Sequence, residues 1–325
     1  MSRYLLTGAA GFIAARVADL LLADGHTVVG VDNLNDAYDV RLKHWRLARL
    51  QAQPGFQFAP LDIGDRPGLA ALWQSAGPFE AVINLAARAG VRYSVENPWV
   101  YLATNTTGTL NLLELCRAYG TGKFVLASTS SLYGANNTLP YREDANTDRP
   151  LSPYAASKKA AEVLGYTYHH LYQLDVTVLR YFTVYGPAGR PDMSLFRFVQ
   201  WISEGRPVTI FGDGEQSRDF TYVDDIARGT IAGLRPLGYE IINLGSDRPA
   251  KLMAMLRLVE QLVGRRAEII YQPAHPADVA ATWADVGRAG RLLGWEPRVG
   301  YEQGVENLVA WYQREREWAR AIVTD

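Results

Sequence analysis

Tyr154 and Lys158 are spaced so that both side chains would project from the same face of a helix. A tyrosine hydroxyl ordinarily titrates near pH ~10, and a neighbouring ammonium group favours its ionised, phenolate form. Such a phenolate can act as a general base. Pro153, immediately before the pair, suits the first turn of a helix. Tyrosine–lysine pairs at this spacing are common and usually structural, so the chemical interpretation depends on the neighbouring segments.

Four hydroxyl side chains, Ser128 to Ser131, directly follow the strand-like segment 123–127. In open α/β sheets, ligands bind in the crevice outside the carboxyl ends of the strands. Hydroxyl groups at this position would therefore line a binding site. The alternative is a turn in which serine and threonine hydroxyls bond only to their own backbone.

A glycine turn, 8–14, follows the first strand-like segment and opens a helical pattern. Glycines there allow the backbone to approach a pyrophosphate at the positive end of the helix, although a plain tight turn has the same sequence. Asp32 ends the next strand, where a carboxylate bonds ribose hydroxyls and repels the extra phosphate of NADP. The two features together favour NAD. Arg41 and Lys43 are close by in sequence, and we interpret them as part of a solvated helix face.

Strand-like and helical segments alternate through the first half of the chain. The predicted strands are 4–6, 27–31, 81–85, 123–127 and 176–179, and the predicted helices are 12–22, 41–53, 100–118 and 154–171. This alternation indicates a Rossmann-type, doubly wound parallel sheet of the α/β class. After about Gly186, prolines and glycines break up shorter elements. We therefore predict a first domain over 1–185, to which 220–245 returns, and a smaller α/β domain over 186–325.

The composition is that of an ordinary globular protein, with 48% hydrophobic residues and a net charge of −1. Nothing in the charge distribution suggests a nucleic-acid partner or a membrane surface. The single cysteine, Cys116, excludes an internal disulfide framework. The chain starts directly with a strand and shows no signal-peptide pattern, so a cytoplasmic location is expected.

Taken together, the glycine turn, Asp32, Asn84–Ala87, the hydroxyl cluster and Tyr154–Lys158 resemble the extended short-chain dehydrogenase/reductase family over nearly the whole chain. The resemblance implies that Tyr154 is the acid/base, that Lys158 holds the nicotinamide ribose, and that Thr129 orients the substrate hydroxyl. It also implies a tightly bound NAD that is regenerated in each turnover. The residues expected around NAD, besides Tyr154 and Lys158, are Gly8, Gly11, Phe12, Ile13, Asp32, Asn33, Asp62, Ile63, Leu85, Ala86, Ala87, Asn105, Tyr181 and Val184.

Three segments, 32–39, 89–98 and 180–193, are similar to those of UDP-glucuronate 4-epimerases within that family. This similarity implies that the smaller domain binds a nucleotide sugar. The residues expected around the substrate are Thr129, Ser130, Ser131, Thr183, Arg190, Phe211, Gln216, Arg218 and Asp278. Arg190 and Arg218 suit charge-assisted bonds to diphosphate or carboxylate oxygens, although both also suit ordinary ion pairs.

The implied reaction is epimerisation at C4 of a UDP-sugar through a 4-keto intermediate, with Tyr154 removing and returning the proton of O4. From glucuronate this intermediate is a β-keto acid that can lose CO₂. Neutral hydrogen bonds from Thr129, Ser130, Ser131 and Thr183 are expected to hold the carboxylate against that loss. Ala188 stands where such epimerases often have tryptophan, which predicts a roomier sugar pocket.

Three alternatives remain open. A UDP-glucose/UDP-galactose 4-epimerase would share the catalytic residues and differ in its contacts to C6 of the sugar. A decarboxylase or dehydratase of the same family is disfavoured, because dehydratases typically have an acidic pair where Ser130 and Ser131 follow Thr129. The third is a nucleotide-binding protein without catalysis. We expect a homodimer through helices 100–118 and 154–171, and no metal site, since His275 has no partner at suitable spacing.

Overall fold

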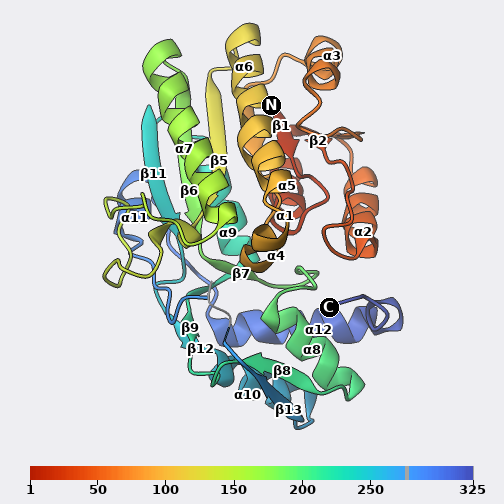
Figure 1. Cartoon of the computed structure of the whole chain (residues 1–325). Helices are drawn as coiled ribbons and strands as arrows, with labels where there is room; N and C mark the ends of the chain where they lie inside the picture. The colour runs from red at the N-terminus through yellow and green to blue at the C-terminus, as the bar shows by residue number, and fades with distance from the viewer. Residues whose placement is uncertain (275–277, 325) are drawn as a thin grey trace.

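Seven parallel strands form the central sheet of the larger lobe, in the order β11-β6-β5-β4-β1-β2-β3 (Figure 1). The computed structural model describes residues 1–274 and 278–324. The strands of the sheet are β1 (Arg3–Thr7), β2 (Thr27–Val31), β3 (Phe56–Ala59), β4 (Ala81–Asn84), β5 (Lys123–Thr129), β6 (Asp175–Tyr181) and β11 (Tyr239–Leu244). The predicted class, a doubly wound α/β fold, is confirmed by this sheet.

Helices cover both faces of the sheet, which explains why its inner strands are buried along nearly their whole length. One face packs against α1 (Phe12–Ala23), α2 (Val40–Gln51), α9 (Val223–Ala232) and α11 (Gly287–Leu293). The other packs against α3 (Arg66–Ala76), α6 (Thr109–Tyr119) and α7 (Pro153–Tyr172). Every residue of β5 is buried, as expected for a strand with helices on both sides.

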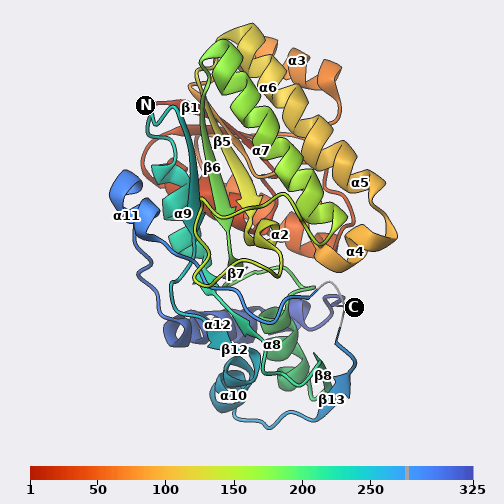
Figure 2. The same cartoon turned by 60° about the vertical axis from the view of Figure 1, so that its left-hand side comes forward.

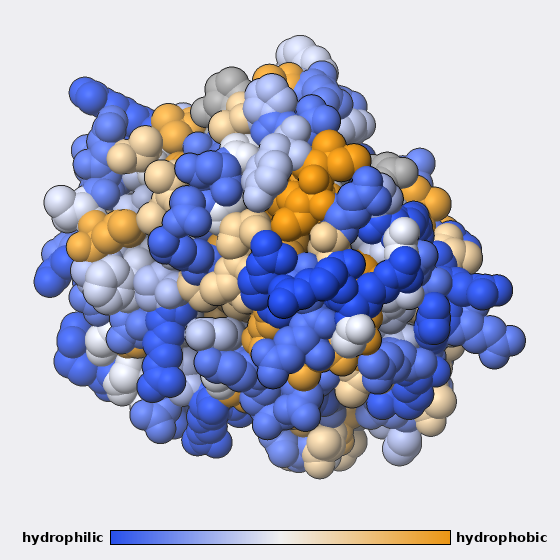
Figure 3. Space-filling view, turned by 90° about the horizontal axis from the view of Figure 1, so that it is seen from below, coloured by the Kyte–Doolittle hydropathy of each residue, from blue (hydrophilic) through white to orange (hydrophobic). Residues whose placement is uncertain are grey.

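The smaller lobe lies below the carboxyl edge of the sheet in Figures 1 and 2. Its core joins α8 (Ser194–Glu204), α10 (Leu252–Val263) and α12 (Tyr301–Ala319) to the parallel pair β8 (Val208–Phe211) and β13 (Ile269–Gln272). Two short pairs lie near the junction of the lobes: β7 (Thr183–Tyr185) with β10 (Phe220–Tyr222), and β9 (Ser217–Arg218) with β12 (Ala250–Lys251). Figure 3 shows the molecule from below, on the side of the smaller lobe. This surface is mostly hydrophilic, with hydrophobic side chains gathered in a central strip.

The chain passes between the lobes more than once. Within the segment 220–245, which was predicted to return, α9 packs on α1 and β11 pairs with β6. Helix α11 also returns and packs against β11 and α9, although the predicted second domain, 186–325, placed it away from the sheet. The larger lobe is therefore completed by segments that lie after the smaller lobe has begun.

Several local predictions need correction. The predicted helix 100–118 is a continuous run of α5 (Trp99–Tyr101), a π-helix η1 (Leu102–Gly108) and α6. Strands β3 and β11 were not predicted; they are the two edge strands of the sheet, and each is only partly buried. The hydroxyl cluster spans the last two residues of β5, Ser128 and Thr129, and the start of the 3₁₀ turn η2 (Ser130–Tyr133), and α4 (Val91–Glu96) follows β4. None of the described helices is both long and apolar enough to span a membrane.

The order of the strands reverses between β1 and β4, since β2 and β3 lie to one side of β1 and β4 to β11 to the other. The connections that leave β1 and β4 therefore diverge, and a crevice opens at the carboxyl edge between them. The glycine turn after β1, Asp32 after β2, Ala86 after β4 and the hydroxyls after β5 all lie at this edge. The topology brings together the segments that the sequence marked as chemical.

Candidate active site

A cavity of about 370 Å³ lies at the carboxyl edge of the sheet. We call it the main cavity. Its walls come from the glycine turn, the ends of β2, β4 and β5, the first turn of α7 and the segment that follows β6. The predicted site residues that line it are Gly8, Gly11, Phe12, Ile13, Asp32, Asn33, Asp62, Ile63, Leu85, Ala86, Ala87, Thr129, Ser130, Ser131, Tyr154, Lys158, Tyr181, Thr183, Val184 and Arg190.

The glycine turn fits closely against the end of β4. Gly8 has a φ of +70°, and a Cβ atom on it would lie only 2.8 Å from the backbone nitrogen of Ala86. Any other residue would push the turn away from β4. Gly11 donates its N–H to the carbonyl of Gly8 at 2.7 Å, which closes the turn just before α1 begins. The amino end of α1 thus faces the cavity, where its orphan N–H groups suit an anion.

Asp32 is fixed by the backbone on both sides of it. Its carboxylate accepts N–H bonds from Ala10 at 3.1 Å and from Leu34 at 2.8 Å. The ammonium of Lys43 lies 3.8 Å from the same carboxylate and is almost fully buried. Burial lowers the pKa of Lys43, and the charge of Asp32 opposes that effect. The interpretation of Lys43 as solvated was therefore wrong, whereas Arg41 is exposed and pairs with Asp39.

The spacing of α2 contained the signal that was missed. Its buried residues are Leu42, Lys43, Arg46, Leu47 and Leu50, which follow the three- and four-residue spacing of one helix face. Asp39 caps the helix by accepting the N–H of Arg41, so the start of the helix, and with it the inward face, is fixed locally. Two cations placed on the same face as three leucines should have been expected to point inward.

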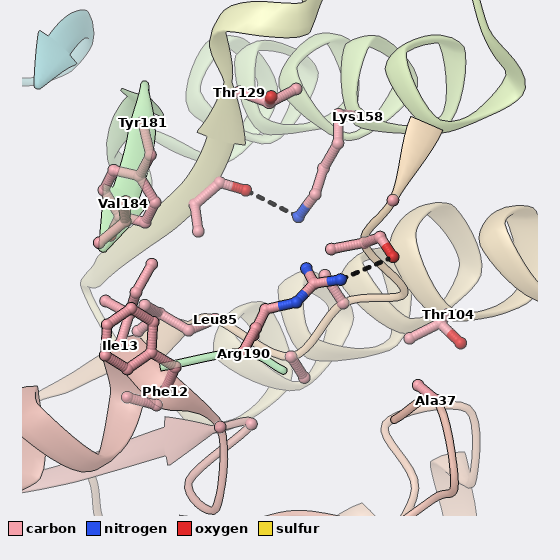
Figure 4. A pocket seen from close by; sticks show the side chains of 18 of the residues that line it. Phe12, Ile13, Ala37, Leu85, Thr104, Thr129, Lys158, Tyr181, Val184 and Arg190 are labelled. Atoms are coloured by element: carbon pink, nitrogen blue, oxygen red, sulfur yellow. Dashed lines mark hydrogen bonds between the residues drawn. The ribbon is translucent and has the colours of Figure 1, made fainter. Parts of the chain in front are cut away.

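Lys158 and Tyr154 both line the main cavity, but the lysine is held by the backbone (Figure 4). The ammonium of Lys158 donates to the carbonyl oxygen of Ala127 at 2.9 Å. Burial lowers the pKa of Lys158 to about 8, while the charge of Glu162 raises it. Burial also raises the pKa of Tyr154, whereas a hydrogen bond with Thr129 and the charge of Arg190 lower it. Thr129 and Arg190 therefore both favour the phenolate in this arrangement.

Arg190 crosses the middle of the cavity in Figure 4. Its Nη2 donates to the carbonyl of Ala89 at 3.4 Å, and its Nε donates to the carboxylate of Asp192 at 3.0 Å. Its Nη1 makes no hydrogen bond within the described residues. The guanidinium can therefore offer one edge to an anionic group of a ligand while Asp192 holds the other.

A buried charge network lies behind Lys158. Glu162, one turn further along α7, accepts two hydrogen bonds from Arg180, at 3.0 and 2.8 Å, and one from Ser128 at 2.6 Å. Arg180 also donates to the hydroxyl of Tyr133 at 3.1 Å. The glutamate and arginine side chains are each only 2% exposed, so each charge depends on the other for compensation. The network ties α7, β5 and β6 together beneath the cavity.

Five predicted site residues do not line the main cavity. Asn105 is buried in η1, where its amide bonds to both backbone groups of Arg88 and to the hydroxyl of Ser157. The other four are in the smaller lobe and form a separate group near its junction with α4. They are Phe211, Gln216, Arg218 and Asp278.

Arg92 connects this group to the larger lobe and was not predicted as a site residue. Its guanidinium lies 4.1 Å from the centre of the Phe211 ring and pairs with Asp278 at 2.7 Å. Gln216 donates to the carbonyl of Phe211 at 2.9 Å, and burial lowers the pKa of Arg218 while Asp278 opposes that effect. Only the contact across the two lobes reveals Arg92, because α4 and β8 are far apart in sequence.

Two further predictions concern the edge of the site. Ala188 is buried, has a φ of +51° and does not line the main cavity, so the roomier sugar pocket stays a prediction. Its carbonyl oxygen accepts two hydrogen bonds from Arg46, at 3.1 and 2.7 Å. His275 lies outside the described residues. The cavity wall includes polar residues that the sequence did not single out, namely Asn35, Tyr38 and Thr104.

Comparison with known proteins agrees with this geometry. Residues 4–245 match the model of the NAD dependent epimerase/dehydratase family. The chain is 56% identical, over 99% of both proteins, to a UDP-glucuronate 4-epimerase of Thermodesulfobacterium geofontis. The fold is similar to that of UDP-glucuronic acid 4-epimerase from Bacillus cereus, solved with UDP-glucuronic acid and NAD, with a TM-score of 0.90, 36% identity, and coverage of 96% and 99%. It is also similar to the UDP-glucose 4-epimerase of Thermotoga maritima, with a TM-score of 0.90, 33% identity, and coverage of 97% and 99%.

Proposed function

The chain belongs to the NAD dependent epimerase/dehydratase family, and from that premise we propose that it interconverts UDP-glucuronate and UDP-galacturonate by inverting C4. The observation that carries this proposal is the main cavity, where Tyr154, Thr129 and Arg190 meet beside the glycine turn. The 56% identity to a UDP-glucuronate 4-epimerase over the full length favours glucuronate over a neutral hexose.

The residues of the main cavity fit NAD. The turn at Gly8 leaves no room for a side chain, the amino end of α1 is open to an anion, and Asp32 stands at the end of β2 where ribose hydroxyls are recognised. Ile13, Leu85, Tyr181 and Val184 form an apolar wall across the cavity from Lys158 in Figure 4, which suits a nicotinamide ring. Bound NAD supplies a reversible oxidant for C4, so the sugar passes through a 4-keto form and returns with either configuration.

The protein residues contribute proton transfer and orientation. Tyr154 as phenolate takes the proton of the sugar O4 and returns it after the sugar has turned, while the hydroxyl of Thr129 stabilises the phenolate by hydrogen bonding. Arg190 holds Tyr154 nearer to its ionised form by its charge. Lys158, anchored on the carbonyl of Ala127, presents its remaining N–H groups to the ribose of the cofactor.

We assign recognition of the C6 carboxylate of the sugar to the neutral hydroxyls of three residues and to the guanidinium of Arg190. Ser130, Ser131 and Thr183 line the cavity next to Arg190, whose Nη1 has no hydrogen-bond partner among the described residues. Hydroxyl donors can hold the C6 carboxylate so that the C5–C6 bond lies in the plane of the C4 carbonyl of the 4-keto sugar. In that orientation the C5–C6 bond does not overlap the carbonyl π system, and loss of CO₂ is disfavoured. The nucleotide is assigned to Arg92, Phe211, Arg218 and Asp278 at the junction of the lobes.

The substrate assignment is tested by incubating the purified protein with UDP-glucuronate, UDP-glucose and UDP-xylose, without added NAD. We expect UDP-galacturonate as the main product, with kcat/KM for UDP-glucuronate at least ~100-fold above that for UDP-glucose, because the neutral sugar cannot form a charge-assisted bond with the Nη1 of Arg190. Arg190→Gln should lower the ratio of kcat/KM for UDP-glucuronate to kcat/KM for UDP-glucose. Faster turnover of UDP-glucose would favour the neutral-hexose epimerase, and CO₂ as the main product would show that the enzyme is a decarboxylase.

The pH dependence follows from the pKa of Lys158, which burial lowers to about 8. A lysine with a lowered pKa is charged below that value and loses its proton as the pH rises through it. The epimerisation rate should therefore fall above about pH 8. Lys158→Arg keeps a cation at higher pH, so its rate, although lower overall, should stay flat over the same interval. Rate profiles from pH 6 to 10 test this, and the same alkaline decline in both proteins would contradict it.

A homodimer is proposed on the strength of exposed apolar side chains along α7 and η1. Val163 and Tyr166 on α7 are 52% and 53% exposed, and Leu102 on η1 is 43% exposed. Figure 2 shows the α5–α6 run and α7 side by side on the outer face of the sheet. Exposed apolar side chains gathered on one face commonly mark a protein interface. A cytoplasmic location stays a prediction.

A further inference from the structure

Arg46, on α2, is buried at the junction of the lobes, with only 3% of the residue exposed. Its Nε and Nη2 donate to the carbonyl of Ala188 at 3.1 and 2.7 Å, and its Nη2 also donates to the carbonyl of Gly189 at 3.1 Å. Its Nη1 donates to the carbonyl of Ala10 at 3.1 Å and to the hydroxyl of Tyr38 at 2.8 Å. A guanidinium has five N–H donors, so these bonds leave none for a ligand. Arg46 therefore acts on the segments that it joins.

The bonds to Ala188 and Gly189 fix two consecutive peptide units directly before Arg190. A peptide unit is planar, and the unit that contains the Gly189 carbonyl also contains the Cα atom of Arg190. Ala188 has a φ of +51°, a conformation that a residue with a Cβ atom keeps only when its surroundings hold it. Arg46 holds it with two hydrogen bonds to one carbonyl, and so sets the point from which the Arg190 side chain starts.

The segment 187–193, which carries Arg190, has little other attachment to the larger lobe. Among the described residues, its other hydrogen bond to that lobe is the 3.4 Å contact of Arg190 with the carbonyl of Ala89. The bonds from Arg190 to Asp192 lie within the segment and cannot anchor it. The place of Arg190 in the main cavity therefore depends on Arg46.

Arg46 also reaches the cofactor side of the main cavity. Ala10, which accepts its Nη1–H, lies in the glycine turn and donates its own N–H to Asp32. The ring centre of Tyr38 lies 5.6 Å from the guanidinium carbon of Arg46 and 6.0 Å from that of Arg190. A substitution of Arg46 can thus change both the affinity for NAD and the place of Arg190. Assays at saturating NAD separate the second effect from the first.

We propose that Arg46 is a positioning residue, which holds Arg190 in the main cavity and thereby sets the preference for a uronate over a neutral hexose. The inference rests on the proposed function, in which Arg190 meets the C6 carboxylate of the sugar. Arg46 does not line the main cavity, so it acts through Arg190 and not by touching the substrate. A charge-assisted bond to a carboxylate needs close alignment, and a displaced Arg190 would lose that bond while the neutral sugar would lose little.

The test is Arg46→Lys, which keeps the positive charge but cannot bridge the same set of carbonyls. At saturating NAD, the ratio of kcat/KM for UDP-glucuronate to kcat/KM for UDP-glucose should fall roughly tenfold. The value for UDP-glucose should change much less than the value for UDP-glucuronate. The acidic limb of the rate profile should also move to higher pH, because the charge of Arg190 lowers the pKa of Tyr154.

A double-mutant cycle distinguishes positioning from a general structural role. In the Arg190→Gln background, Arg46→Lys should lower the ratio no further, since the side chain that it positions is already gone. The matched control is Arg49→Lys, which replaces an exposed arginine one turn further along α2 and should keep the wild-type ratio. If Arg46→Lys does not fold, Gly189→Ala takes its place. A Cβ atom on Gly189 would lie 3.0 Å from the carbonyl oxygen of Gly186, which crowds the segment and leaves Arg46 intact.

Two results would overturn the proposal. One is an equal loss of kcat/KM for both sugars in the variant that folds, and the other is a further fall of the ratio when Arg46→Lys is added to Arg190→Gln. Failure of the proposed function is distinguishable from both, because the wild type itself would then show no preference for UDP-glucuronate. The shift of the acidic limb, measured with whichever UDP-sugar is turned over, would still test whether Arg46 places Arg190.

Discussion

Tyr154→Phe is expected to lower kcat for epimerisation by about 10²–10⁴-fold, the usual contribution of a positioned general acid/base. The phenyl ring preserves the edge contact with Tyr101, whose ring centre lies 6.0 Å away, so the fold and the cavity should be unchanged. Only the oxygen that accepts and returns the O4 proton is lost. The measurement is kcat together with the NAD content and the Kd for UDP-glucuronate, both of which should stay near the wild-type values.

The control for this experiment is Thr129→Val. Loss of the hydroxyl that bonds to Tyr154 should leave turnover measurable while moving the acidic limb of the rate profile to higher pH, since that hydrogen bond lowers the pKa of the tyrosine. A Tyr154→Phe protein that retains NAD and turns over within tenfold of the wild-type rate would remove the tyrosine from the mechanism.

The largest expected effect on stability comes from Glu162→Gln, which should lower the free energy of unfolding by about 3–5 kcal/mol. The substitution leaves the guanidinium of Arg180, 2% exposed, without a counter-charge inside the core. Glutamine keeps the size of the side chain, so the loss reports on charge compensation and not on a cavity. Denaturant unfolding of the NAD-loaded protein, at matched cofactor concentration, measures it.

The double variant Glu162→Leu, Arg180→Met separates charge from position. Replacing both members of a buried ion pair by apolar residues of similar volume is often close to neutral, so most of the lost stability should return. The alkaline limb of the Glu162→Gln rate profile should also move to lower pH, since Glu162 raises the pKa of Lys158. Equal destabilisation by the single and double variants would mean that packing, and not charge, dominates at this position.

The sequence predicted those parts of the molecule that depend on local spacing. The helix α7 begins at Pro153, and the side chain of Ser152 caps it by accepting the N–H of Ala155. The start of this helix is therefore set by four consecutive residues, 152–155. The glycine turn and Asp32 are likewise set by residues close in sequence. Since parallel strands end at a common edge, predicting the strands was enough to bring these segments to one cavity.

Features that depend on long-range contacts were not predicted. Arg190 was predicted near the sugar, but it was not predicted that its charge, after the hydrogen bond with Thr129, lowers the pKa of Tyr154 from the loop after β7. The pairing of Arg92 with Asp278 joins α4 to a segment of the other lobe, and neither residue alone suggests it. Lys43 and Arg46 are a different case, because their inward direction follows from the same helical spacing that buries Leu42 and Leu47. The prediction for Lys43 relied on its charge, and it did not use the helical spacing that places this residue on the buried face.

The repeated passage of the chain between the lobes sets a limit on modular engineering. A fragment that stops at residue 185 would lack β11, α9 and α11, leaving β6 as a bare edge and one face of the sheet uncovered. Neither lobe is therefore an autonomous folding unit, and both should unfold in one cooperative transition. New sugar specificity cannot be introduced by exchanging a terminal block of sequence. It has to be built by replacing individual loops within an intact chain.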